Sequence, residues 1–179
     1  MRPLVAQSPA PRLPRGIAVR IVPREELLKA AGDPHLDLDP GFVRDALARG
    51  DMAFGAFEGG RLVGYTWRTF TEAPDRDGLW ARVSHPYQYS YKGFTRPSHR
   101  RRRIHVAITA FADAYFLRRG YAFEVGYLEL DNFASIGLAD FMGRRRIGYA
   151  GYVRWLGRSI PFRTPAVKKI GAELFELDE

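Results

Sequence analysis

The chain has 179 residues, with 28 lysine and arginine residues against 20 aspartate and glutamate residues, which gives a formal net charge of +8. The absence of cysteine excludes a disulfide framework, a thiolate nucleophile and a cysteine-ligated zinc site. No apolar run approaches the roughly 20 residues that a membrane-spanning helix needs, so we expect a cytoplasmic protein without a membrane partner. The basic surplus favours an anionic ligand.

The first 16 residues contain several prolines and arginines but no continuous apolar segment. They lack the pattern of a signal peptide, and we expect residues 1–16 to form a flexible leader. The rest of the chain, residues 17–179, has the length of one domain, and we expect a single domain there.

Apolar periodicities, with proline, glycine and capping residues at their ends, predict the secondary structure. The polar, proline-punctuated segment 71–86 predicts a loop. In chain order the patterns predict a strand at 17–22, helices at 24–31 and 40–48, a hairpin of strands at 52–58 and 61–70 joined by Gly59-Gly60, a strand at 87–95, a helix at 104–119, a strand at 121–130, a helix at 132–143, a strand at 146–156 and short strands at 159–163 and 172–177. Helices that interrupt strands in this way predict an α/β fold with a mixed β-sheet flanked by helices.

The most informative stretch is the turn between the predicted strand at 87–95 and the helix that follows it. Five arginines lie there, Arg96 and Arg100 to Arg103, together with Ser98. The first N–H groups of a helix have no partner within the helix, and the dipole is positive at that end. Arginine side chains also bind phosphate groups through two parallel hydrogen bonds. The sequence therefore predicts a phosphate-binding turn.

In element order and in two local motifs, the chain from about Ile17 to Leu156 resembles the GNAT acyltransferase superfamily. That family has a proline and then an arginine after its fourth strand, here Pro97 and Arg100. A later helix of the family opens on asparagine and closes on glycine, here Asn132 and Gly143. The resemblance implies a GNAT-like mixed sheet that is split between its fourth and fifth strands, with acyl-CoA bound in the split.

The resemblance also implies which residues bind the co-substrate, acetyl-CoA or another acyl-CoA. The thioester oxygen would accept a hydrogen bond from a backbone N–H near Phe94 or Thr95. No metal is expected, because the acidic residues around His35 do not have the spacing of a calcium loop. The implied co-substrate-binding residues are Phe94, Thr95, Arg96, Ser98, Arg100, Arg101, Arg102, Arg103, Ile104, His105, Asn132 and Ser135.

Three positions depart from the family pattern. The glycines expected three and five residues after Arg100 are Arg103 and His105, and the tyrosine that often protonates the departing thiolate is Ala139. Glycine is favoured in such a turn because a phosphate approaches the backbone closely. Arg103 either compensates by binding the same phosphate or blocks the pocket, and the sequence leaves both alternatives open.

Acyl transfer to an amine needs a general base and a route for the proton of the leaving thiolate. Glu129 is our first candidate for the base, because it lies near the end of the predicted strand at 121–130, beside the expected split. A salt bridge to one of the many arginines is the alternative role for Glu129. Tyr127 is the candidate that could replace the missing phenol, although core packing is the commoner role of a strand tyrosine. We expect Glu124, on the other face, at the surface or in an ion pair.

Three functions account for these features, in decreasing order of preference. The first is an acyl-CoA-dependent N-acyltransferase, most simply an N-acetyltransferase, that acts on an amine-bearing small molecule or peptide and transfers groups other than aminoacyl groups. The second is a catalytically inactive domain of the same fold that binds CoA or another anionic ligand. The third is nucleic-acid binding by the arginine turn and Arg144–Arg146. The acceptor, the acyl length and the formation of a homodimer stay open.

Overall fold

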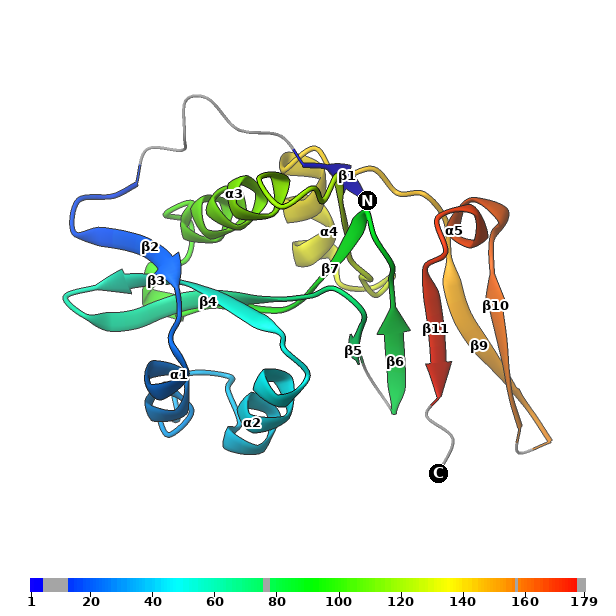
Figure 1. The fold of residues 1–179 in the computed structure, drawn as a ribbon, viewed down its shortest axis with the longest axis horizontal. Helices are drawn as coiled ribbons and strands as arrows, with labels where there is room; N and C mark the ends of the chain where they lie inside the picture. Colours follow the sequence, from blue (N-terminus) through cyan, green and yellow to red (C-terminus); the bar gives the residue numbers. More distant parts are fainter. Residues whose placement is uncertain (5–12, 76–77, 157, 177–179) are drawn as a thin grey trace.

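The computed structural model describes residues 1–4, 13–75, 78–156 and 158–176 (Figure 1). Its strands are β1 (Arg2–Pro3), β2 (Ile17–Ile21), β3 (Met52–Glu58), β4 (Arg61–Thr69), β5 (Glu72–Pro74), β6 (Leu79–Arg82), β7 (Tyr87–Thr95), β8 (Phe123–Val125), β9 (Ala150–Trp155), β10 (Arg158–Arg163) and β11 (Glu173–Glu176). Its helices are α1 (Arg24–Ala30), α2 (Pro40–Ala48), the short 3-10 helix η1 (Pro97–His99), α3 (Ile104–Leu117), α4 (Phe133–Phe141) and α5 (Pro165–Lys169). Within this part of the chain, no helix is long and apolar enough to cross a lipid bilayer.

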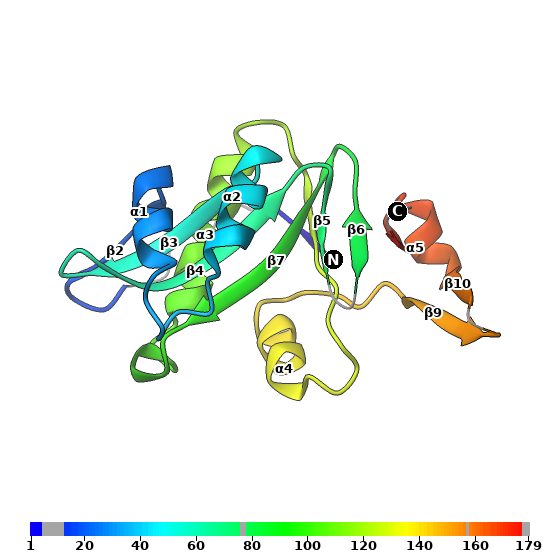
Figure 2. The same cartoon turned by 90° about the horizontal axis from the view of Figure 1, so that it is seen from below.

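Six strands form the main sheet, in the order β1-β8-β7-β4-β3-β2. All neighbours run antiparallel except β7 and β8, which are parallel. Helices α3 and α4 lie on one side of this sheet, and α1 and α2 lie on the other (Figure 1). The hairpin of β9 and β10 stands apart from the main sheet in both views (Figures 1 and 2). The predicted mixed sheet flanked by helices is thus confirmed.

Two hydrophobic cores hold the helices against the sheet. On one face Ile104 and Ile108 of α3 pack in a cluster with Phe54 of β3. On the other face Leu27 of α1 is buried in a cluster with Trp67 of β4. The apolar stripe of α3 is therefore directed at the sheet, as its helical spacing predicts.

The hairpin of β3 and β4 forms as its glycines predict. Gly59 and Gly60 have φ of +57° and +80°, which only glycine adopts readily and which a type I′ turn requires. Glu58 pairs with Arg61 across this turn. The turn thereby places β4 between β3 and β7, in the middle of the sheet.

The prediction of a flexible leader was wrong for the first four residues. Arg2–Pro3 forms the edge strand β1, which pairs antiparallel with β8, and the Leu4 N–H donates to the carbonyl oxygen of Ala122 at 2.8 Å. Local composition could not show this pairing, because the partner strand lies more than a hundred residues further along the chain. The leader residues 5–12 lie outside the described residues.

The segment 71–86, predicted as a loop, contains the short strands β5 and β6. They form a three-stranded sheet with β11, in the order β11-β6-β5. Three or four residues are too few to give a clear alternating pattern, and the pairing with β11 comes from the far end of the chain. The predicted strand at 172–177 corresponds to β11, and its last position lies outside the described residues.

Candidate active site

The main sheet opens between β7 and β8. The two strands pair only between Tyr87–Tyr89 and Phe123–Val125. Strand β7 continues to Thr95, and from residue 90 onward no strand pairs with it on that side. The described structure therefore has the split between the predicted strands at 87–95 and 121–130, where the sequence motifs place it.

Strand β8 is shorter than the predicted 121–130. Beyond Val125 the chain diverges from β7, and a backbone without a neighbouring strand cannot continue a sheet. Gly126, which weakens a strand interior, is the first residue of this loop. Tyr127 and Glu129 consequently lie in the loop that leads to α4, not on a strand.

Strand β7 carries a bulge at the open edge of the split. Trp67 of β4 pairs with Tyr91, and Tyr65 pairs with Phe94, so β7 has one more residue than β4 between these pairs. Lys92 at this point has a φ of +41°. A bulge leaves its extra residue out of the hydrogen-bonded ladder. The bulge lies next to Phe94, on the part of β7 that borders the split.

The turn after β7 has the backbone of a tight anion-binding loop. Arg101 and Arg103 have φ of +62° and +56°, in the left-handed region that favours glycine. At the position of Arg103, the family pattern described above has glycine. Helix α3 starts directly after Arg103 without a side-chain cap. Its first N–H groups are therefore available to an anion.

Three arginines of the turn are available to a ligand. Arg101 and Arg103 are exposed, and neither makes a side-chain hydrogen bond or ion pair with a residue that the structure describes. Arg100 is exposed and donates only to the carbonyl oxygen of Thr95, at 3.3 Å. Arg102 is partly committed, because it pairs with Glu58 at 3.0 Å.

Arg96 does not join this group, which corrects the prediction that it contacts the co-substrate. Its side chain is buried, donates to the carbonyl oxygen of Leu62 at 2.8 Å and pairs with Asp33. It ties the end of α1 to the centre of the sheet. The sequence gives the position of an arginine but not the direction of its side chain, and this one is directed into the protein.

Ser98 and His99 form the outer part of the turn. The exposed Ser98 Oγ lies 2.8 Å from His99 Nδ1, and His99 Nε2 lies 2.9 Å from a carboxylate oxygen of Glu58. His99 and Arg102 together lower the pKa of Glu58. Strand β3 thus anchors the turn through Glu58.

His105 lies against the bulge of β7. A Cβ added to Gly93 would lie 2.7 Å from His105 Cε1, so the imidazole occupies the space that a larger residue would need. Burial and the positive charges of Arg144 and Arg68 lower the pKa of His105 to about 4. The ring is therefore neutral at pH 7 and adds no positive charge to the arginine turn.

Asn132 caps α4 as the sequence predicts. Its side-chain oxygen accepts a hydrogen bond from the Ser135 N–H at 3.1 Å. Both residues lie at the end of the loop that borders the split. Their contact with an acyl-CoA stays a prediction.

Tyr127 has the environment of a phenol that keeps its proton. Its ring meets that of Tyr89 edge to face, with 5.8 Å between the ring centroids, and its hydroxyl is buried without a hydrogen-bond partner among the described residues. Burial and the nearby Asp75 raise the pKa of Tyr127 well above its ordinary value. Glu129 is half-buried in the same loop, and its role as a base stays a prediction.

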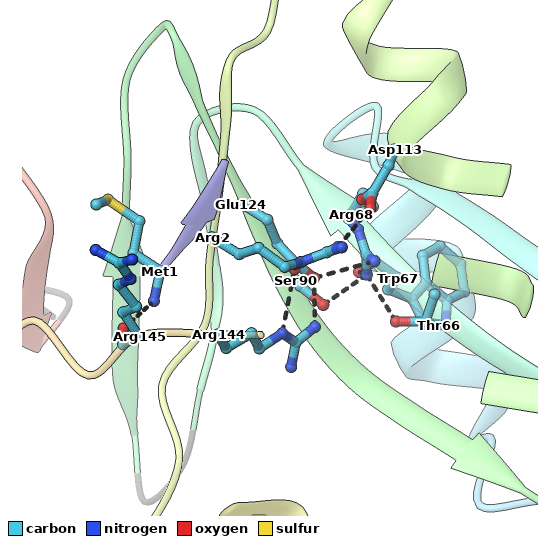
Figure 3. A network of polar contacts seen from close by, with 10 residues as sticks. All are labelled: Met1, Arg2, Thr66, Trp67, Arg68, Ser90, Asp113, Glu124, Arg144 and Arg145. Atoms are coloured by element: carbon cyan, nitrogen blue, oxygen red, sulfur yellow. Dashed lines mark hydrogen bonds and ion pairs between the residues drawn. The ribbon is translucent and has the colours of Figure 1, made fainter. Parts of the chain in front are cut away.

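A cluster of buried charges lies at the paired end of the split (Figure 3). Glu124 of β8 is 1% exposed and binds the guanidinium groups of Arg2 at 3.0 Å, Arg68 at 3.2 Å and Arg144. Arg2 also pairs with Asp113 of α3. The cluster therefore joins β1, β4, β8, α3 and the segment after α4 at one point.

The cluster contains three guanidinium groups and two carboxylates, and their charges act on one another. Burial alone would raise the pKa of Glu124, but Arg68, Arg144 and Arg2 outweigh it and hold that pKa well below its ordinary value. Burial and the charge of Glu124 raise the pKa of Asp113 to about 6. Glu124 is thus a fixed negative charge, whereas Asp113 titrates near neutral pH.

Sequence reasoning placed Glu124 at the surface or in an ion pair, and the ion pair is confirmed. It missed Arg2, Arg68 and Asp113. Two signals were present: a charged residue, Asp113, between two alanines in the apolar stretch of α3, and Arg68 in a β-rich run of large apolar residues. A charge in such a position is buried only when it has a partner.

No metal centre is evident in residues 1–4, 13–75, 78–156 and 158–176. No group of three or more histidine, aspartate or glutamate side chains lies close enough there to hold a metal ion.

Comparisons with known proteins identify relatives by structure but not by sequence. No protein-family model matches the chain, and the comparison with curated proteins gave no match. The chain is similar to the structure of the aminoglycoside N-acetyltransferase AAC(6')-Iy in complex with CoA, with 17% identity over 81% of this chain and 99% of the other and a TM-score of 0.59.

Two further structures show the same arrangement. One is the aminoglycoside 6'-N-acetyltransferase AAC(6')-Ih from Acinetobacter baumannii, with 13% identity over 78% of this chain and 98% of the other and a TM-score of 0.59. The other is an integron cassette protein from the mobile metagenome of V. cholerae, with 15% identity over 88% and 99% of the chains and a TM-score of 0.55. At these identities the likeness shows a shared fold.

Proposed function

We propose that this chain, which has the GNAT acyltransferase fold, transfers an acyl group from acyl-CoA to the amine of a small molecule or peptide. One observation carries the proposal: the uncapped start of α3 lies just after the strand that borders the split. Arg101 and Arg103 there are exposed, and their side chains have no partner among the described residues. Acetyl is the first acyl group to test, because two of the similar structures are named as N-acetyltransferases.

The turn would bind the pyrophosphate of acyl-CoA. The backbone N–H groups at the start of α3 would donate to phosphate oxygens, and the exposed guanidinium groups of Arg100, Arg101 and Arg103 would neutralise their charge. The left-handed backbone at Arg103 lets an arginine take the conformation that the motif reserves for glycine. This supports the alternative in which Arg103 compensates for the missing glycine.

The bulge of β7 would polarise the thioester. A backbone N–H beside Phe94 is free of the ladder with β4, and a preorganised donor of this kind typically stabilises the transition state by roughly 3 kcal/mol. Attack of a neutral amine on the carbonyl carbon then forms the tetrahedral intermediate. No side chain is required for this step.

Proton transfer would involve Glu129 and Tyr127. Glu129, through water, would take the proton of the amine. Tyr127, which is protonated at neutral pH, would give a proton to the departing thiolate in place of the phenol that is absent at Ala139. We also propose a cytoplasmic location for the protein.

The catalytically inactive binder is the second candidate, and His105 favours it. Its ring lies against Gly93 at the bulge, where the acyl-CoA arm would pass. Nucleic-acid binding is less well supported. Of the three arginines at 144–146 that it would use beside the arginine turn, Arg144 is bound to the buried Glu124.

Calorimetric titration with acetyl-CoA and CoA tests the proposal. We expect micromolar binding by the native protein and at least a tenfold loss in the double variant Arg101→Ala/Arg103→Ala. Its matched control is Arg118→Ala/Arg119→Ala, which removes the same charge at the opposite end of α3 and should bind normally.

A thiol-release assay with a panel of amines separates the two candidates. The panel should include aminoglycosides, since these are the substrates named for the similar enzymes, together with amino acids, polyamines and peptides. Turnover that is lost in Tyr127→Phe and Glu129→Gln supports the enzyme. Binding without turnover of any amine supports the inactive binder. No binding of CoA by the native protein rejects the acyltransferase and leaves, of these two, only a binder of another anionic ligand.

A further inference from the structure

A cavity of about 460 Å³ belongs to the candidate active site. It is bounded by the loop after β8, by α4, by the segment 144–150 and by residues of β10 and α5. Two of its lining residues are Tyr127, the proposed proton donor to the thiolate, and Ala139, where the family pattern has a tyrosine. The cavity therefore adjoins the place that the proposed function gives to the reacting sulfur.

An ion pair and two hydrogen bonds hold the walls of this cavity in place. At the start of the segment 144–150, Arg144 pairs with the buried Glu124 of β8. Near its end, the Tyr149 N–H donates to Thr164 Oγ1 at 3.0 Å, and the Thr164 N–H donates to the Tyr149 carbonyl oxygen at 2.9 Å. The segment is thus fixed both to the main sheet and to the C-terminal elements, so the cavity is a built feature of the fold.

The wall of the cavity is mainly apolar. Ala139 is 6% exposed and Val167 is 3% exposed, and the small side chain of Ala139 leaves open the space that a tyrosine would fill. Burial of an apolar group against such a wall is favourable because it removes apolar surface from water. The largest apolar lining residues are Val125, Leu128, Ile136, Ile147, Phe162 and Val167.

The cavity is larger than an acetyl group needs. Pockets of roughly 300–1,000 Å³ enclose whole small molecules, whereas acetyl has a single methyl group beyond the thioester carbonyl. The acyl carbon is bonded to the sulfur that Tyr127 would protonate. The further carbons of a longer acyl chain would therefore start beside Tyr127, at the wall of the cavity.

The charged lining residues favour the acyl chain over the acceptor as the occupant. Among the described residues, three arginines, at 144–146, line the cavity with two acidic residues, Glu124 and Asp140. Most amines carry a positive charge in solution, and this excess of guanidinium groups would repel them. A neutral alkyl chain has no such penalty.

Given the proposed acyl transfer, we propose that the cavity holds the alkyl chain of the acyl group, so that the preferred co-substrate is a medium-chain acyl-CoA such as octanoyl-CoA. The transfer keeps the same balance as with acetyl. The C–S bond of the thioester breaks, the C–N bond of the amide forms, and the thiolate gains a proton as the amine loses one.

Calorimetric titration of the full chain with CoA, acetyl-CoA and octanoyl-CoA tests this inference without an amine. Each methylene that leaves water strengthens binding by about fourfold, so we expect octanoyl-CoA to bind at least tenfold more tightly than acetyl-CoA. Equal affinities for the two thioesters would overturn the inference and leave the acyl transfer standing. If neither CoA nor any acyl-CoA binds, both proposals fail.

Two variants locate the alkyl chain. Ala139→Phe should remove most of the preference for octanoyl-CoA over acetyl-CoA because it fills the cavity. The matched control is Ala166→Phe on α5, since Ala166 is exposed and is not part of the cavity wall; it should keep the preference. Thermal unfolding establishes that each variant is folded, and Ile136→Phe, which also alters the wall, replaces Ala139→Phe if that protein does not fold. A folded variant of this kind that binds CoA and keeps the full preference would overturn the inference.

The thiol-release assay separates the acyl chain from the acceptor as the occupant. With one amine, kcat/KM should be at least tenfold higher for octanoyl-CoA than for acetyl-CoA. With acetyl-CoA, octylamine should have no advantage over ethylamine as the acceptor. An advantage for octylamine, without one for octanoyl-CoA, would place the acceptor in the cavity and overturn the inference.

Discussion

At the residue scale, Glu124 has the most demanding environment in the molecule. Its carboxylate is buried and is in contact with three guanidinium groups that come from three separate parts of the chain. A single carboxylate is thus the common partner of β1, β4 and the segment after α4. The charge of Glu124, more than its size, holds these parts together.

Glu124→Gln should lower the free energy of unfolding by about 3–5 kcal/mol, because it leaves buried guanidinium groups without their counter-charge. Urea unfolding measures the change. Glu26→Gln is the control: it breaks an ion pair with Arg20 in which both side chains are 41% exposed, and it should lower the free energy of unfolding by less than about 1 kcal/mol. Equal effects of the two changes would contradict the role assigned to Glu124.

His105 should make stability depend on pH. Its pKa is about 4 in the folded protein and near 6.5 in the unfolded chain, so between these values only the unfolded chain binds the proton. Stability from this residue is therefore present above pH 6.5 and is lost as the pH falls toward 4. Asp113, whose folded pKa is raised to about 6, acts with the opposite sign over the same range.

The variant His105→Phe separates the effect of His105 on the pH dependence of stability from that of Asp113, because Asp113 is present in both the native protein and the variant. We expect the native protein to lose more free energy of unfolding between pH 7.5 and pH 5 than the variant does. Urea unfolding at the two pH values gives the comparison. Parallel losses in the two proteins would show that His105 is protonated equally in the folded and unfolded states.

At the element scale, the turn between β7 and α3 combines a strained backbone with exposed arginine side chains. Arg101 and Arg103 hold left-handed backbone conformations, which are unfavourable for residues with a Cβ by roughly 1 kcal/mol each. Such positions are typical of sites where function outweighs stability. Here the side chains of the two strained residues form neither a hydrogen bond nor an ion pair with any described residue.

Arg103→Gly should raise the free energy of unfolding by about 0.5–1 kcal/mol, because glycine adopts the left-handed conformation without strain and is accepted as a helix N-cap. The same change should weaken acyl-CoA binding. The neighbouring Arg102→Gly, at a position without positive φ and with an ion pair to Glu58, should lower stability instead. Chemical denaturation of the three proteins tests the contrast, and a loss of stability in Arg103→Gly would argue against strain at this position.

At the scale of the whole molecule, one edge of the main sheet is formed by the start of the chain. Strand β1 covers the outer edge of β8, and Leu4 is 5% exposed in the core under α3. Arg2 carries the connection into the buried cluster. The start of the chain is thus part of the scaffold that fixes β8 beside the split.

Arg2→Ala should release β1 from the sheet. The amide proton of Leu4, which donates to the Ala122 carbonyl oxygen at 2.8 Å, should exchange slowly in the native protein and quickly in the variant. Amide exchange measured by NMR provides the readout. Arg20→Ala, which removes an exposed partner of Glu26, should leave the Leu4 amide protected, and rapid exchange of that amide in the native protein would contradict the strand.

The sequence by itself determined the parts of this protein that depend on neighbouring residues. Glycine pairs, caps and helical spacing are local signals, so the hairpin at Gly59-Gly60, the cap at Asn132 and the apolar stripe of α3 were all predicted and are confirmed. The arginine turn and the place of the split follow from the same local order of strand, proline and helix.

The tertiary structure alone decided where side chains point and which distant segments meet. It turned Arg96 into the interior toward Asp33, ended β8 at Val125, and brought Arg2 to Glu124 across most of the chain. A sequence pattern specifies the periodicity of an element, whereas the partner of a buried charge is set by how the elements pack. For that reason the position of the arginine turn could be predicted from the sequence, and the charged cluster could not.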